Sequence, residues 1–245
     1  MKILQRLRTP LLVGLAVMLP GLLSASPIGT LDIAGLGVVR VSVSTIDFGP
    51  TGGGTGVFVV TATDGSFTTV PLGSDGTIVD LANPPVVPGP PLGSPVTPFF
   101  FTPATGTPLF AFNLEQVFLG GGTPCTVAPA VGHSCTPSEI VASSPFVLTQ
   151  NTGSVSVGFS VRGTVFDLTD GTSAPYVGLF TANLTRAATD TVPEVLAALG
   201  PGGPGFIESS WSAEFTTVPE PASLTLIGAG IGLLALAGRL RHSRV

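Results

Sequence analysis

Apolar and polar residues alternate with a period of two along much of the chain. The longest such run is 154–162, in which every second residue is Val or Phe. A period of two places alternate side chains on opposite faces of a β-strand, so this segment is expected to be a half-buried strand. The same pattern predicts further strands at 38–44, 57–63, 67–70, 77–81, 110–118, 165–169, 176–185 and 211–217.

Turn residues separate these strands. Asp64-Gly65 is a turn dipeptide that would join 57–63 to 67–70 in a hairpin. One short helix is expected at 192–199, because Pro193 suits a first helical turn and Gly200 a helix end.

Composition supports an all-β fold. The chain has 33 Gly and 24 Pro, and only 9% of its residues are charged, which is typical of turn-rich β structure. We predict an antiparallel β-sandwich of about eight to twelve strands, with a jelly roll as one candidate. The Pro-rich segment 83–98 is either a long loop across one domain or a linker between two small domains, and we favour one domain over 26–218.

The N-terminus has the three parts of a secretory signal peptide. Lys2, Arg6 and Arg8 precede an apolar run at 11–23, and small residues follow it. The run is short for a membrane anchor, so we favour a signal peptide over 1–25, cut between Ala25 and Ser26. The Sec translocon and signal peptidase are the partners that such a signal implies.

A second apolar segment lies near the C-terminus. Residues 222–238 carry no charge, and as a helix they would span about 25 Å, close to the hydrocarbon thickness of a bilayer. Arg239, Arg241 and Arg244 follow in the basic tail 239–245 and would be retained on the cytoplasmic side. We therefore predict a single transmembrane helix with the body of the protein in the periplasm.

Pro219-Glu220-Pro221 immediately precedes this apolar segment. Prolines keep a peptide extended and accessible, as a protease substrate has to be. The tripeptide, the apolar segment and the Arg cluster together resemble the PEP-CTERM sorting signal of Gram-negative bacteria, over 219–245. The resemblance implies that an exosortase, an integral-membrane cysteine transpeptidase, cleaves at Pro219, Glu220 and Pro221, which are then substrate residues. The alternative is a plain single-pass anchor with an accidental Pro-Glu-Pro.

The charges of the body differ from those of the ends. Residues 26–218 keep three of the nine Lys and Arg, namely Arg40, Arg162 and Arg186, but thirteen of the fourteen Asp and Glu. Nucleic acids and anionic lipids bind clustered cations, so this balance argues against both as partners and indicates an acidic extracellular domain.

The two cysteines lie close together. In an oxidising periplasm Cys125 and Cys135 are expected to form a disulfide. A sharper alternative makes Cys125, His133 and Cys135 metal ligands with Glu139 as a fourth, or Cys125 and His133 a nucleophile and its base. The spacing matches no common metal site, so no metal and no cofactor are assigned.

No catalytic residues are assigned, and we expect a non-enzymatic protein. Asp167 and Asp170 could serve a hydrolase or bind calcium, but turns containing Asp-Gly are commoner. The aromatic residues between Phe99 and Phe118 are expected to pack in the core rather than form a sugar-binding platform. The leading hypothesis is an exported cell-surface or extracellular protein associated with exopolysaccharide. The alternatives are a carbohydrate-binding or adhesive β-sandwich and, with less support, a secreted hydrolase.

Overall fold

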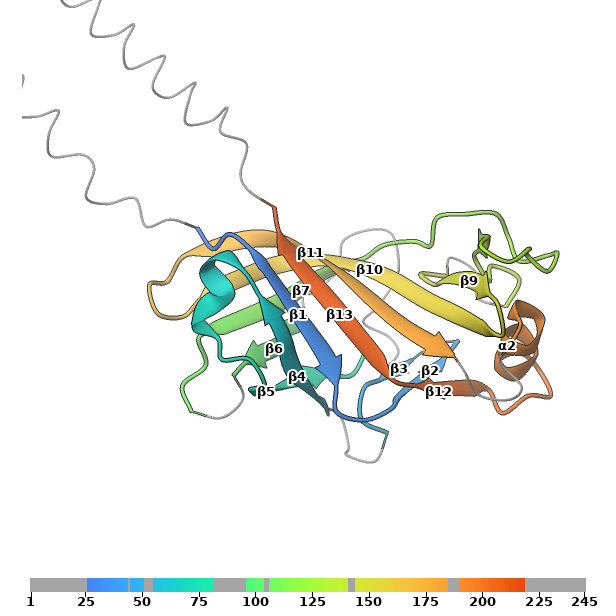
Figure 1. Ribbon diagram of the computed structural model, residues 1–245, viewed down its shortest axis with the longest axis horizontal. Helices are drawn as coiled ribbons and strands as arrows, with labels where there is room; N and C mark the ends of the chain where they lie inside the picture. Colours follow the sequence, from blue (N-terminus) through green and yellow to red (C-terminus); the bar gives the residue numbers. More distant parts are fainter. Residues whose placement is uncertain are drawn as a thin grey trace, which may run out of the picture.

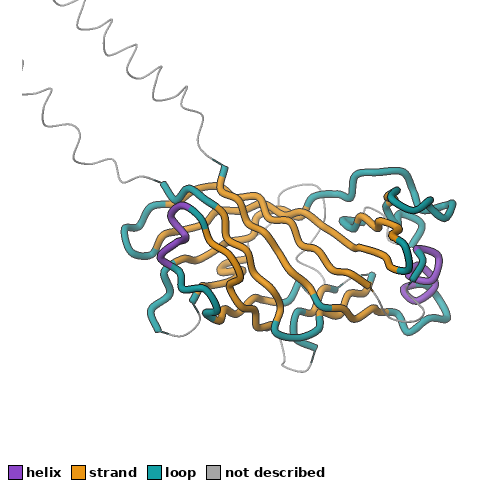
Figure 2. The backbone as a smooth tube through the Cα atoms, in the orientation of Figure 1, coloured by secondary structure: helices purple, strands orange, loops and turns teal. Residues whose placement is uncertain are grey.

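The computed structural model of the chain describes residues 26–43, 45–50, 55–81, 96–103, 106–140, 144–184 and 190–218. Figure 1 shows their arrangement and Figure 2 the distribution of helix and strand. In chain order the elements are β1 (Thr30–Gly35), β2 (Val39–Ser42), β3 (Ile46–Asp47), β4 (Thr55–Thr63), the 3₁₀ helix η1 (Gly65–Thr69), β5 (Asp75–Val79), β6 (Val96–Thr102), β7 (Phe110–Val117), β8 (Ser134–Cys135), β9 (Val147–Asn151), β10 (Ser154–Asp167), β11 (Ser173–Leu184), α2 (Val192–Leu199), β12 (Phe206–Ser209) and β13 (Trp211–Thr217).

The principal sheet closes on itself as an eight-stranded antiparallel barrel. Its order is β1-β4-β5-β6-β7-β10-β11-β13, and β13 also pairs with β1 to complete the circle. The predicted β-sandwich is therefore wrong, although the prediction of an all-β antiparallel fold agrees with the structure. Alternation along a strand fixes which face is buried in either architecture, but it does not specify which strand edges pair.

Aromatic rings fill the inside of the barrel. Phe112 on β7 stacks on Phe100 of β6 with ring centroids 4.1 Å apart, and it also contacts Tyr176 of β11 and Phe215 of β13. All four side chains are buried. The expectation that the aromatic residues between Phe99 and Phe118 pack in the core is confirmed for Phe99, Phe100, Phe110 and Phe112.

The segment after Asp64-Gly65 is not the predicted strand. Gly65 has a positive φ of 61°, and the chain then forms the 3₁₀ helix η1, whose Phe67 packs between Phe110 and Phe112. The hairpin partner of β4 is β5 instead, with Thr55 opposite Val79. The error arose because a short apolar stretch with turn signals on both sides has the same composition whether it lies in a sheet or plugs the end of a barrel.

The long strands β10 and β11 extend beyond the barrel. They pair over most of their length, and the other edge of β10 is covered first by β9 and then by β7. Figure 1 shows this extension reaching α2 and β9, away from the start of β1 and the end of β13. Val155, Leu184 and Val195 belong to a second apolar cluster there, so the described residues form two adjoining cores.

The predicted helix at 192–199 is confirmed as α2. Thr191 and Glu194 form a capping box at its N-terminus, and Pro193 lies in the first turn. A capping box satisfies two of the backbone N–H groups that a helix start leaves without partners. Val192 also donates its N–H to Gln150 Oε1, at 2.9 Å, so β9 contributes to holding the helix against the second core.

The Pro-rich segment around 82–95 lies outside the described residues, but the strands on either side of it pair with each other. Thr77 and Ile78 of β5 face Phe101 and Phe100 of β6. Both sides therefore contribute to the same barrel.

Packing of rings inside the barrel predicts a large effect at Phe112. Phe112→Ala should lower the free energy of unfolding by about 3–5 kcal/mol, because it removes a fully buried ring and leaves a cavity among its aromatic neighbours. Val57→Ala, on the outer face of β4 where the side chain is 45% exposed, is the matched control and should cost less than about 1 kcal/mol. Denaturant titration of the processed protein measures both, and equal losses would contradict a ring-packed interior.

Candidate functional site

The chain leaves the barrel at the end of β13, where hydrogen bonds hold its last residues to the neighbouring strands. Thr217 donates its backbone N–H to the Gly29 carbonyl at 3.0 Å, and Val218 donates to the Pro175 carbonyl at 2.8 Å. The Gly29 N–H in turn donates to Thr217 Oγ1 at 2.8 Å. The residue before Pro219 is therefore still hydrogen-bonded to the sheet.

Both ends of the body lie at the same end of the barrel, as Figure 1 shows. Antiparallel pairing of β1 with β13 requires this, since Thr30 begins β1 opposite Thr216 near the end of β13. Ser26, the predicted first residue after signal cleavage, precedes Gly29 by three positions. Ser26 and Val218, the described residues next to the two predicted processing positions, therefore both lie near this end of the barrel.

The seam between β1 and β13 carries two acids opposite each other. Asp32 pairs with Glu214 in the register of the two strands. Partial burial, and then the negative charge of Glu214, raise the pKa of Asp32 above its ordinary value. Like charges at directly opposite positions destabilise a strand pair.

Asp167 and Asp170 lie in the hairpin between β10 and β11, at the same end of the barrel as Thr217. Asp167 Oδ1 accepts the Thr169 N–H at 2.8 Å, and Asp170 Oδ1 accepts both the N–H and the hydroxyl of Thr172. The hydrogen bonds from Thr172 lower the pKa of Asp170. These contacts are the ones by which Asp stabilises a turn.

Cys125 and Cys135 form the predicted disulfide, with their Cα atoms 5.0 Å apart. Neither sulfur is then a thiolate able to bind a metal or attack a substrate. His133 and Glu139 are both exposed. Within the part of the chain that the structure describes, no group of three or more His, Cys, Asp or Glu side chains could hold a metal ion.

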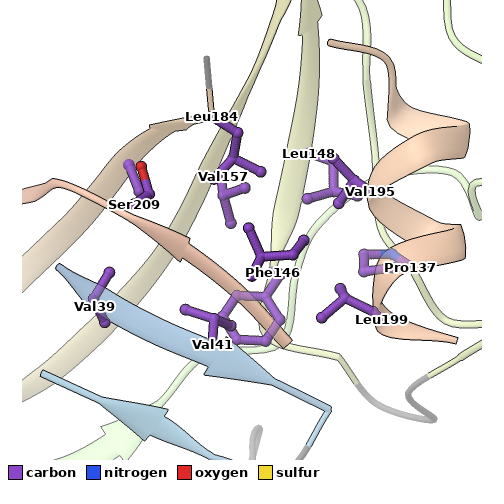
Figure 3. Close-up of a pocket in the computed structure, with 12 residues that line it drawn as sticks. Val39, Val41, Pro137, Phe146, Leu148, Val157, Leu184, Val195, Leu199 and Ser209 are labelled. Carbon is purple, nitrogen blue, oxygen red and sulfur yellow. The ribbon is translucent and has the colours of Figure 1, made fainter. Parts of the chain in front are cut away.

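An apolar cavity lies where the two cores meet. Figure 3 shows side chains from β2, α2 and the segment just before β9 directed toward one another across it, among them Val41, Leu199 and Phe146. Its volume is about 30 Å³, whereas small-molecule sites typically occupy about 300–1,000 Å³. The cavity is therefore a packing defect that is too small to hold an organic ligand.

A wider hollow opens on the outer surface beside β10. It measures about 350 Å³, and its lining includes the partly exposed residue Phe118 together with Ser160 and Thr181. Phe118 differs in this respect from its neighbours Phe110 and Phe112, which are buried. Phe118 therefore reaches the surface in this hollow, next to polar residues.

Several predicted site residues lie outside the described residues: Ala25, Pro219, Glu220, Pro221, the apolar segment 222–238, Arg239, Arg241 and Arg244. In the described ranges there is no helix of the length and hydrophobicity needed to cross a membrane.

The comparisons with known proteins bear on the tail. Residues 217–241 match the family model of the PEP-CTERM protein-sorting motif, which confirms the resemblance inferred from the sequence. No curated protein and no solved structure matches the chain. The motif marks an exported protein that an exosortase processes, and the match begins at Thr217, the last residue of β13.

Sequence reasoning missed β1 and therefore the closeness of the two ends. Leu31 and Ile33 are buried and alternate with Thr30 and Asp32, so the period-two signal was present. It is only six residues long and merges into apolar, Gly-rich sequence that hides its boundaries.

The pair of Asp32 and Glu214 predicts that neutralising one of the two carboxylates stabilises the fold in a pH-dependent way. Because folding raises the pKa of Asp32, the protonated carboxyl group stabilises the folded state. This contribution to the free energy of unfolding is lost as pH rises through the folded-state pKa. Glu214→Gln should therefore raise the free energy of unfolding at neutral pH by about 0.2–1 kcal/mol, and the gain should vanish near pH ~3, where carboxyl groups are largely protonated.

Glu208→Gln is the matched control, because Glu208 instead accepts hydrogen bonds from Arg40 at 2.6 and 2.9 Å. That variant should lose stability at neutral pH. Denaturant titrations at both pH values measure the effects, and a Glu214→Gln gain that persists unchanged at low pH would contradict the electrostatic explanation.

Proposed function

We propose that the chain is the precursor of a non-enzymatic extracellular protein that is held in the inner membrane by its C-terminal tail and passed to the cell surface or the exopolysaccharide matrix by cleavage. The observation that carries this proposal is the PEP-CTERM motif match, which starts where the folded barrel ends. The order of barrel, Pro-Glu-Pro, apolar segment and Arg cluster suits a body exported first and released afterwards.

In the precursor, residues 222–238 span the membrane and Arg239, Arg241 and Arg244 stay in the cytoplasm. The signal peptide 1–25 is removed by signal peptidase after Sec export. An exosortase then cuts at Pro219, Glu220 and Pro221. The acidic body, with its three cations at 26–218, has little affinity for an anionic membrane once the tail is gone.

A non-enzymatic role is supported by how the candidate catalytic groups are used. Cys125 is bonded to Cys135, and Asp167 and Asp170 accept hydrogen bonds within their own turn. These contacts are structural, since the disulfide closes a loop and the two carboxylates stabilise a hairpin turn.

The second candidate function is carbohydrate binding or adhesion by the barrel. The hollow beside β10 favours it, because an aromatic residue, Phe118, lines it together with the hydroxyl-bearing residues Ser160 and Thr181. Aromatic side chains provide a large apolar contact surface, and neighbouring hydroxyls can bond the polar groups of a sugar. Retention of the processed protein on the host's own polysaccharide, lost in Phe118→Ser, would favour this candidate over a passive matrix protein.

The sorting proposal predicts two cleavages, of which only the C-terminal one depends on the exosortase. Intact-mass analysis of the protein from medium, envelope and membrane fractions should show loss of residues 1–25 in every strain, but a C-terminus near Pro219–Pro221 only when the exosortase gene is present. Glu220→Ala should leave the full tail in the membrane fraction, and Glu214→Gln, in the barrel, is the control that should be processed normally. A C-terminus that is unprocessed in both strains would leave an ordinary anchored periplasmic protein.

A further inference from the structure

The distance between the folded barrel and the predicted membrane span is very short. Val218 is bonded to Pro175 in the sheet, and Ala222 begins the apolar segment four residues later. A fully extended chain covers about 3.3–3.6 Å per residue, so the rim of the barrel lies within about 14 Å of the hydrocarbon core. This step rests on the proposed function, in which 222–238 spans the membrane.

About half of that distance is occupied by lipid headgroups. The headgroup layer of one leaflet takes up about 5–8 Å, which leaves about 6–9 Å between the lipid surface and the barrel. A single packed helix is about 10 Å across. An enzyme that holds the peptide 219–221 in its active site therefore has no room to do so without touching the rim.

The hairpin between β10 and β11 projects from the rim beyond the point where the tail leaves the barrel. Tyr176 of β11 lies opposite Thr217, and β11 begins at Ser173, so the hairpin tip at 168–172 extends beyond the position where the tail leaves. Leu168 at this tip is 48% exposed, and Ile28 and Val218 beside the exit are 53% and 44% exposed. We define these three side chains as the exit rim.

Acidic side chains surround the exit rim. Asp64 follows β4 beside Gly29, donating its N–H to the Thr30 carbonyl, and Asp167 and Asp170 lie in the hairpin. The two cations of the body within the described residues, Arg40 and Arg162, lie on β2 and within β10 rather than at this end. An acidic rim with exposed apolar side chains is poorly suited to rest on anionic lipid and better suited to a protein surface.

We infer that the exit rim is a docking surface for the exosortase, so that the enzyme recognises the folded end of the barrel together with the Pro-Glu-Pro peptide. The alternative is that β13 peels from the barrel to lengthen the peptide. Peeling would break the bonds from Thr217 to Gly29 and from Val218 to Pro175 and expose the buried Phe215, so it would carry the cost of opening the barrel.

The first experiment combines rim substitutions with a change in tether length. The full-length precursor is expressed in its host as wild type, as Ile28→Asp/Leu168→Asp, and as Leu36→Asp, a matched control that is 57% exposed in the loop after β1, at the opposite end of that strand. Each is made with the native tether and with about 12 Gly/Ser residues inserted between Val218 and Pro219, which adds about 20 Å of mean reach. Pulse-chase labelling and intact mass measure the rate of C-terminal cleavage.

With the native tether, the rim variant should be cleaved about threefold to tenfold more slowly than wild type, as expected for the loss of one or two interface contacts. Leu36→Asp should be cleaved at the wild-type rate. With the long tether, all three should be cleaved at similar rates, because the enzyme no longer needs to approach the rim. Equal rates for the rim variant and Leu36→Asp on the native tether would overturn the inference.

The second experiment tests peeling directly. Thr30 and Thr216 are opposite each other next to the hydrogen-bonded position formed by Thr217 and Gly29, so Thr30→Cys/Thr216→Cys can cross-link β1 to β13. Cleavage of the cross-linked precursor at the wild-type rate supports docking of a folded rim. A block that is relieved by a reductant overturns it in favour of peeling.

Two controls keep the outcomes separate. Protease resistance of the barrel in the same samples identifies any variant that fails to fold, and Ile28→Ser/Leu168→Ser then replaces the Asp pair. A strain lacking the exosortase gene tests the premise. C-terminal cleavage that continues in this strain contradicts the proposed function itself. Cleavage that requires the gene but proceeds at the same rate in the rim variant and in wild type contradicts only this inference.

Discussion

The pairing of β1 with β13 is the constraint on which the rest of the molecule depends. It joins the first and last strands of the body, and without it the sheet would be open at both edges. Closure surrounds the ring cluster of Phe100, Phe112 and Phe215 on all sides. An open sheet would expose those rings and leave two unpaired strand edges, which are sites of aggregation. The barrel therefore forms only after its last strand has been exported, because β13 is required to close it.

The same pairing brings the two ends of the folded body together at one end of the barrel. The antiparallel register brings Gly29 and Thr217 into hydrogen-bond contact, so the chain enters the barrel and leaves it toward the sorting motif at the same rim. The far end, with α2, the disulfide loop and the hollow lined by Phe118, faces away from both. A ligand contact at that far end would therefore lie away from the point where the chain leaves the barrel.

The sequence was most informative where a signal is local. The period-two runs of β11 and β13, the helix at 192–199 and the Cys125–Cys135 pair were predicted from neighbouring residues and agree with the structure. The predicted strands 154–162 and 165–169 are parts of one continuous strand, β10. The sorting motif was recognised because its three parts are contiguous. Barrel closure was not predicted, because β1 and β13 are far apart in sequence and a strand does not encode its partner. Phe67 was misassigned to a strand because its partners, Phe110 and Phe112, are also distant.

Amide hydrogen exchange on the processed protein tests the closure of the barrel most directly. If β1 and β13 complete a single cooperative barrel, their amides, including that of Thr217 bonded to Gly29, should exchange only through global unfolding, with the same opening free energy as the amides shared by β10 and β11. Amides in β1 and β13 that exchange through a much smaller opening, while β10 and β11 stay protected, would show that the seam is a loosely attached edge and would contradict a cooperatively closed barrel.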